Sequence, residues 1–295
     1  MGKTTKLLPI AAVCAAAVTV IFRAFQLLVT VDYNEMGFFS TDAGFLSTYG
    51  FYILLIAAAA VFIAAVFIDN KNMNTAFRGD KSALAGKHTA VLGVSFLIAA
   101  CLKFYMVVFS FKGFGIDFIG EGIIFLVFAV IGFMLLGSRK VRSSVGYLML
   151  LISISYTLKA AALFMGDTVI TRVSDELILL LSYVSAVFFF LSLGRYFSGN
   201  ESKGTRHKLL IFAALSACLS GCASLSGYIA LLISSDYMKD HMELHPVSEI
   251  GALIIALAVI FVLYGKKAGF DDIDTNDETN GGADEKTDND EMPSV

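Results

Sequence analysis

Residues 122–137 read GIIFLVFAVIGFMLLG, sixteen consecutive positions without a charged side chain. A helix that crosses a bilayer core about 30 Å thick needs roughly 20 apolar residues, because each residue adds 1.5 Å. Together with the residues before it, this stretch predicts a transmembrane helix over 117–137. The run is continuously apolar and does not alternate with polar positions, so a helix is favoured over a β-barrel strand.

Seven other stretches have the same character. They lie at 7–29, 47–68, 89–111, 144–165, 176–197, 208–233 and 247–265. The sequence therefore predicts an all-α fold, a polytopic transmembrane bundle of eight helices over residues 1–270. The first stretch is predicted to be a retained helix, because its apolar run is longer than the core of a signal peptide and contains Arg23.

The composition excludes several classes of protein. The 295 residues are 57% hydrophobic and 16% charged, with a mean hydropathy of +0.76. Soluble domains are about 45–50% apolar and about 25% charged, and one core of this size cannot hide such an apolar excess. An ordinary soluble enzyme, a disordered chain and a secreted disulfide scaffold are thus excluded.

The loops carry an asymmetric charge that predicts the orientation. If the N-terminus is cytoplasmic, 16 of the 22 Lys and Arg residues fall in inner segments, 3 in outer loops and 3 within spans. Such an excess at every inner loop is the positive-inside pattern of membrane proteins. We therefore expect both termini to be cytoplasmic and the protein to lie in a bacterial cytoplasmic membrane.

The C-terminal segment 271–295 differs from the rest of the chain. It contains ten acidic residues and one lysine, a net charge of −9, which leaves +6 on the membrane part. With almost no apolar residues it cannot offset the entropy of ordering, so we expect a disordered acidic tail. The tail is interpreted as solvating, with docking of a protein partner or attraction of cations as alternatives.

Motifs of cofactors and membrane enzymes are missing from the sequence. All four cysteines fall inside spans and all four histidines in loops, so neither a zinc site nor a disulfide framework is predicted. The sequence has no His-Glu-x-x-His motif, no histidine within a span to activate a serine, and no Gly-rich phosphate loop. We therefore expect a protein that is not an enzyme, binds no cofactor or metal, and has no nucleic-acid partner.

Three cations within the spans are the candidate functional residues: Arg23, Lys103 and Lys159. Each lies in an odd-numbered span, about 15 residues from the predicted cytoplasmic end. A cation in hydrocarbon costs at least about 2.5–3.5 kcal/mol, so three cations at one depth are expected to have partners.

The even-numbered spans supply candidate partners near their outer ends, where the helix dipole favours acids: Glu121, Glu176 and Glu249. An outward helix with a cation, followed by an inward helix that begins with a glutamate, indicates an internal repeat of four helical hairpins. In the seventh span a stripe of small residues replaces the cation and predicts close helix packing: Ser216, Ser220, Ser224 and Gly227.

Three interpretations of the cations remain open. They could pair with the glutamates and fix the helices relative to one another. They could line an outward-facing cavity for an anionic or polar solute. They could also bind lipid headgroups or serve in sensing or assembly with a protein partner. The only prolines near spans, Pro9 and Pro246, lie at span ends, so proline does not signal the broken helices of many transporters.

The longest outer loop, residues 30–46, contains candidates for a cap over the bundle: Asp32, Glu35, Phe38 and Phe39. The string Asp-x-x-x-x-Gly-Phe-Phe after an Arg-containing first span resembles a juxtamembrane element of uncharacterised multi-pass membrane proteins from Firmicutes-type bacteria. The resemblance covers about 20 residues and implies a bacterial origin but no chemistry.

These observations predict a membrane protein of the transporter or permease type, with a cationic site in the outer half of the bundle. The alternative is a structural or sensory membrane subunit that binds lipid, or that meets a protein partner through its outer loops or acidic tail.

Overall fold

The apolar stretches form helices, and the all-α bundle predicted from the sequence is confirmed. The computed structural model describes residues 7–32, 38–39, 44–73, 87–109, 116–137, 143–166, 173–198, 205–234 and 249–265. Its helices are α1 (Leu7–Val29), α2 (Phe45–Met73), α3 (Lys87–Phe109), α4 (Ile116–Gly137), α5 (Ser143–Gly166), α6 (Val173–Phe197), α7 (Thr205–Ser220), α8 (Ser226–Ile233) and α10 (Ile250–Gly265). A π-helical turn, Gly221–Leu225, joins α7 to α8, so that residues 205–233 form one continuous span.

Among the described residues, α10 is shorter than the helices that could cross a membrane. Within the described residues, seven helices are long and apolar enough to cross a membrane, whereas α10 has 16 residues. At 1.5 Å per residue α10 extends about 24 Å, less than the hydrocarbon core of about 30 Å. Helix α10 lies within the predicted span 247–265, of which the structure describes residues 249–265, and it begins next to the buried residue Glu249.

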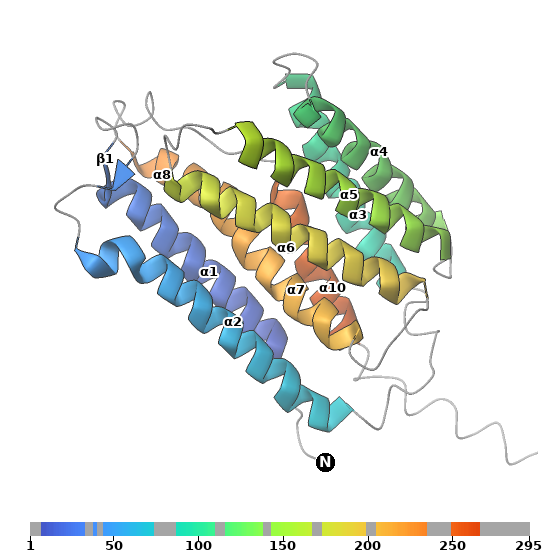
Figure 1. Cartoon of the computed structure of the whole chain (residues 1–295). Helices are drawn as coiled ribbons and strands as arrows, with labels where there is room; N and C mark the ends of the chain where they lie inside the picture. Colours follow the sequence, from blue (N-terminus) through green and yellow to red (C-terminus); the bar gives the residue numbers. More distant parts are fainter. Residues whose placement is uncertain are drawn as a thin grey trace, which may run out of the picture. The chain divides into compact units, whose positions relative to one another are not determined.

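Helices adjacent in the sequence pack as hairpins in most of the bundle. Helix α1 lies along α2, α3 along α4, and α5 along α6, as Figure 1 shows. The segment from α7 to α8 departs from this pattern, because its main contacts are with α6 and α1 and not with α10. The predicted hairpin pairing thus holds for the first three pairs of helices.

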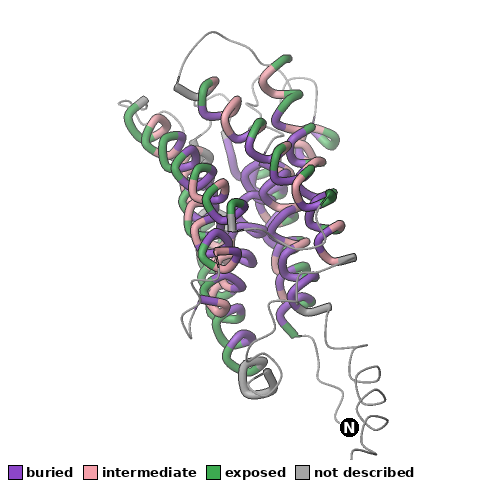
Figure 2. Tube along the Cα trace, turned by 90° about the vertical axis from the view of Figure 1, so that its right-hand side faces the viewer, coloured by how far each residue is buried: buried purple, intermediate pink, exposed green. Residues whose placement is uncertain are grey.

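Most helices have a buried face and an exposed face (Figure 2), whereas in α7 only Lys208 is exposed. The exposed side includes large apolar residues such as Ile21, Ile56, Phe133 and Phe164, each at least 64% exposed. Contiguous apolar surface of this kind is suited to lipid and not to water. The chain is an integral membrane protein.

Glycines bring the helices of the second and third hairpins into close contact. A Cβ atom on Gly93 of α3 would lie 3.1 Å from the carbonyl oxygen of Gly132 on α4, and one on Gly132 would lie 3.2 Å from that of Gly93. Gly146 of α5 and Gly194 of α6 form the same reciprocal contact, at 2.9 and 3.0 Å. In each hairpin the backbones of the two helices are therefore in close contact, near the start of the first helix.

A short antiparallel ladder lies between α1 and α2. Strand β1 (Val31–Asp32) pairs with β2 (Phe38–Phe39), with Val31 opposite Phe39. The chain divides into one unit of residues 1–264 and a second of residues 265–295, of which only Gly265 is described. The predicted acidic tail lies outside the described residues.

Candidate functional site

Four charged side chains from four segments meet inside the bundle. Lys103 lies six residues before the end of α3, Lys159 seven before the end of α5, and Glu121 five after the start of α4. Glu249 immediately precedes α10. At 1.5 Å per residue, all four lie within about 11 Å of one end of the bundle, the predicted outer end. We call these four residues the ion quartet.

The two lysines of the quartet share the two glutamates. The Nζ atoms of Lys103 and Lys159 each donate a hydrogen bond of 2.8 Å to Oε1 of Glu249. Lys159 Nζ also donates to Glu121 Oε1 at 2.5 Å, and Lys103 Nζ forms an ion pair with Glu121 Oε2 at 2.8 Å whose angle is outside hydrogen-bond geometry. Charges therefore alternate around the quartet, and its net charge is zero.

The quartet is almost completely removed from solvent and lipid. The side chains of Lys103 and Glu249 are fully buried, Lys159 is 4% exposed, and Glu121 is 13% exposed. In surroundings of low polarity the attraction between opposite charges is stronger than in water, but each charge also loses its hydration. Mutual pairing is the condition under which four such charges can be buried.

Two tyrosines complete the surroundings of the lysines. The Tyr156 ring lies 5.5 Å from Lys103 Nζ and 5.4 Å from Lys159 Nζ, and the Tyr183 ring lies 4.3 Å from Lys159 Nζ. The negative face of an aromatic ring attracts a cation at these distances. Both rings are therefore part of the site, and neither is among the candidate site residues predicted from the sequence.

Three buried polar atoms of this site have no hydrogen-bond partner among the described residues. They are Oε2 of Glu249, the hydroxyl of Tyr156, and Oε2 of Glu121, which has only its ion pair with Lys103. A buried polar atom without a partner costs about 1–3 kcal/mol. Glu249 thus binds both lysines through one oxygen only, whereas Glu121 uses a different oxygen for each lysine.

The start of α10 is fitted closely to α3. A Cβ atom on Gly251 would lie 2.9 Å from the Cβ atom of Ala99 and 3.1 Å from its Cα atom. The absence of a side chain at Gly251 lets the first turn of α10 approach α3, and this approach places Glu249 beside Lys103. The amino end of α10, which carries a partial positive charge, therefore lies at the quartet.

Arg23 does not join the quartet. It is buried on α1, where its Nη1 atom donates to Oε1 of Gln26 at 3.1 Å and its guanidinium lies 5.9 Å from the Phe51 ring of α2. Helix α1 packs against α2, α7 and α8. Arg23 therefore matches the two lysines in depth but lies in a different part of the bundle.

Glu176, the other candidate acid, is half-buried near the start of α6. Among the candidates for the cap, Asp32 pairs with Phe38 through the backbone ladder, next to Phe39. Glu35 lies outside the described residues. The cap itself stays a prediction.

The predicted stripe of small residues is buried at the π-helical turn. Ser216, Ser220 and Ser224 are at most 1% exposed, and Gly227 is half-buried. Ser220 and Ser182 of α6 share a hydrogen bond of 3.1 Å, while Ser224 donates to the Ser220 carbonyl oxygen at 2.8 Å. We call Ser182, Ser216, Ser220 and Ser224 the serine region.

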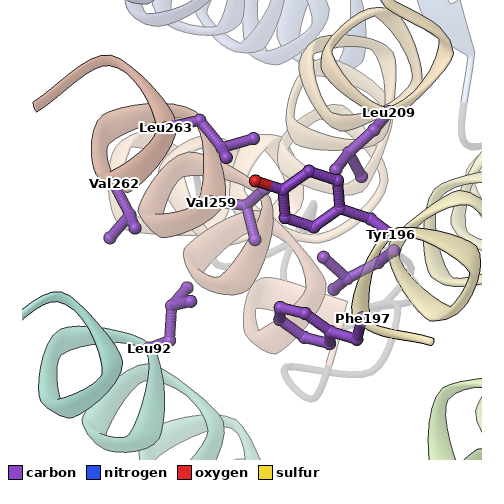
Figure 3. A pocket seen from close by; sticks show the side chains of 8 residues that line it. Leu92, Tyr196, Phe197, Leu209, Val259, Val262 and Leu263 are labelled. Atoms are coloured by element: carbon purple, nitrogen blue, oxygen red, sulfur yellow. The ribbon is translucent and has the colours of Figure 1, made fainter. Parts of the chain in front are cut away.

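An apolar crevice lies elsewhere in the bundle, between α3, α6, α7 and α10 (Figure 3). Its walls include Leu92, Tyr196, Phe197 and Leu209, toward the predicted cytoplasmic end. The space between these side chains is too narrow for a water molecule, so it cannot hold a ligand as it stands.

The described residues contain neither a metal-binding cluster nor a disulfide. Within the described ranges, no group of three or more His, Cys, Asp and Glu side chains could hold a metal ion. All four cysteines are free thiols. Cys218 and Cys222 are buried, whereas Cys14 and Cys101 are exposed on the surface of the bundle.

No protein-family model matches this sequence, and neither the curated proteins nor the solved structures gave a match.

Proposed function

We propose that this chain is a solute transporter or permease-like protein of a bacterial cytoplasmic membrane, and that the ion quartet is its polar site. The observation that carries the proposal is the burial of Lys103, Glu121, Lys159 and Glu249 together within membrane helices.

The energy of the quartet favours a function over a purely structural role. An ion pair buried in a protein is often no more stable than well-packed apolar side chains of the same volume, because both charges lose their hydration. Ionisable residues within membrane helices are accordingly rare and lie mostly on ion, proton or substrate pathways. Four of them at one site are difficult to explain by stability alone.

The short last helix supports the same proposal. Helix α10 begins at Ile250, directly after the buried Glu249, and directs its amino end at the quartet. In many secondary transporters the substrate site lies where a helix begins or ends within the membrane. In this chain the start of α10 supplies a similar arrangement.

A second candidate function is that of a structural or sensory membrane subunit. The favouring observation is that the quartet neutralises itself, since each lysine contacts both glutamates. On this alternative the quartet only fixes α3, α4, α5 and α10, and a lipid or protein partner acts through the outer loops or the acidic tail.

Accessibility of the quartet separates the two functions. A Cβ atom on Gly120 would lie 3.4 Å from Cγ of Lys159, an ordinary van der Waals contact, so Gly120→Cys places a thiol beside the quartet without a clash. The four native cysteines are first replaced by alanine or serine. A membrane-impermeant thiol reagent is then added to either side of oriented vesicles.

A transporter exposes its site to both sides in turn, so the thiol should react from both sides, and a transported solute should change the rates. If the quartet is purely structural, the thiol should not react with the reagent from either side of the membrane. Uptake into proteoliposomes of labelled organic acids, amino acids, phosphate and sugars identifies the solute. Flux should be lost in Lys103→Met and retained in Glu176→Gln, a control at a glutamate outside the quartet.

A further inference from the structure

We infer that the quartet binds the carboxylate of a monovalent organic acid, and that this carboxylate takes the place of Glu249 between Lys103 and Lys159. The inference rests on the proposed function and specifies the class of solute.

The contacts of Glu249 identify it as the carboxylate that is exchanged. It binds both lysines through Oε1 alone, at 2.8 Å each, while its buried Oε2 has no hydrogen-bond partner among the described residues. Glu121 contacts each lysine with a different oxygen, although its Oε2 likewise has no hydrogen-bond partner among the described residues. Glu249 differs in that one of its oxygens binds both lysines and that it precedes α10, whereas Glu121 lies within α4, so we take it as the acid that is exchanged. It already shows that the lysine pair accepts a carboxylate.

The charges of the site set the charge of the ligand. The quartet is neutral, and it has one net positive charge once Glu249 moves away. One carboxylate restores neutrality, whereas a phosphate dianion leaves a net negative charge within the membrane, where an uncompensated charge is costly. The amino end of α10 adds a partial positive charge that also favours an anion.

Tyr156 supplies a third polar group to the same ligand. Its ring contacts both ammonium groups, and its buried hydroxyl has no hydrogen-bond partner among the described residues. A carboxylate has two oxygens, and each can accept more than one hydrogen bond. The lysine pair and the hydroxyl together are donors suited to such a group.

The test is equilibrium binding of labelled propionate to the purified full chain in lipid nanodiscs. Saturable binding to the wild type should be displaced by acetate but not by propionamide or by phosphate, and it should be lost in Lys159→Met. Glu249→Gln removes the carboxylate that competes with propionate for the two lysines. This variant should bind propionate at least about tenfold more tightly than the wild type. Glu176→Gln should bind like the wild type.

The inference is overturned if the wild type shows no saturable propionate binding. Binding to Glu249→Gln alone would not rescue it, because that site would exist only through the substitution. Phosphate that competes as well as acetate also overturns it. If Glu249→Gln does not fold, the wild type and Lys159→Met still decide. Decanoate that competes more strongly than acetate identifies a fatty acid from the bilayer as the source of the carboxylate, and equal competition identifies a soluble acid.

The two proposals can fail separately. Propionate binding without flux of any carboxylate overturns the transporter and leaves the carboxylate site. Lysine-dependent flux of a neutral or cationic solute, without propionate binding, overturns the carboxylate site and leaves the transporter.

Discussion

The ion quartet and the serine region are both buried and polar, but they satisfy their polar groups in different ways. The lysines and glutamates find partners on other helices, from α3 to α10. Ser224 bonds to a carbonyl oxygen of its own segment, and one hydrogen bond between hydroxyls, Ser182 to Ser220, links two helices. Charges thus tie helices together, while small hydroxyl residues mainly let helices approach one another. Variants in each region test this difference.

The largest effect is expected from removing one charge of the quartet. Lys103→Met leaves two glutamates and one lysine buried, and we expect a loss of about 3–5 kcal/mol in the free energy of unfolding. Titration with sodium dodecyl sulfate in detergent micelles measures this free energy. The double variant Lys103→Met/Glu249→Leu keeps the neutral pair of Lys159 and Glu121, so it should lose less than the sum of the two single variants. Additive losses would show that the quartet does not act as a unit.

A smaller loss is expected where α10 meets α3. Gly251→Ala places a methyl group 2.9 Å from the Cβ atom of Ala99, and overpacking of this kind costs about 1–3 kcal/mol. The same unfolding titration measures it, and adding Ala99→Gly should recover most of the loss. Gly122→Ala is the matched control, because no atom lies within 4 Å of its added Cβ. Equal losses at both glycines would contradict a specific contact of α10 with α3.

Arg23 tests whether a buried charge outside the quartet behaves differently. Arg23→Met deprives Oε1 of Gln26 of this donor, a loss that we expect to cost about 1–3 kcal/mol. The double variant Arg23→Met/Gln26→Leu removes both groups and should be closer to the wild type. A loss as large as that of Lys103→Met would mean that Arg23 ties helices in the same way as the quartet.

The smallest effects are expected in the serine region. Ser182→Ala removes a hydrogen bond between two helices, and such bonds contribute about 0.6 kcal/mol on average in membranes. Ser216→Ala should be neutral or stabilising, because the buried Ser216 hydroxyl has no partner among the described residues. Ser216→Ala that destabilises more than Ser182→Ala would contradict this account of the region.

The depth of a residue along its helix can be predicted from the sequence. Which neighbouring helix its side chain faces cannot. Apolar runs located the helices, and counting residues within them placed Arg23, Lys103 and Lys159 at one level. Which cations meet depends on how the helices are ordered and rotated, and that follows from packing between distant segments. The structure accordingly gathers Lys103 and Lys159 and leaves Arg23 beside Gln26.

Two features of the site left weak signals in the sequence. The π-helical turn begins at Gly221, a glycine within an apolar span, which is equally compatible with close packing. The start of α10 lies next to the buried Glu249, which the sequence places at the end of a span, where an acid usually faces the interface. Both features arise from contacts between helices and not from local preference.

The glycine contacts of the second and third hairpins have a mechanical consequence. Gly93 precedes Lys103 by ten residues on α3, about 15 Å along the axis, and its backbone touches that of Gly132. If α3 tilts about its contact with α4 at Gly93, the end of the helix that carries Lys103 moves the most. A tilt of about 5° displaces Lys103 by about 1.3 Å over this distance, which is enough to take its 2.8 Å contacts beyond hydrogen-bond range. A rotation too small to disturb the crossing can thus open the quartet.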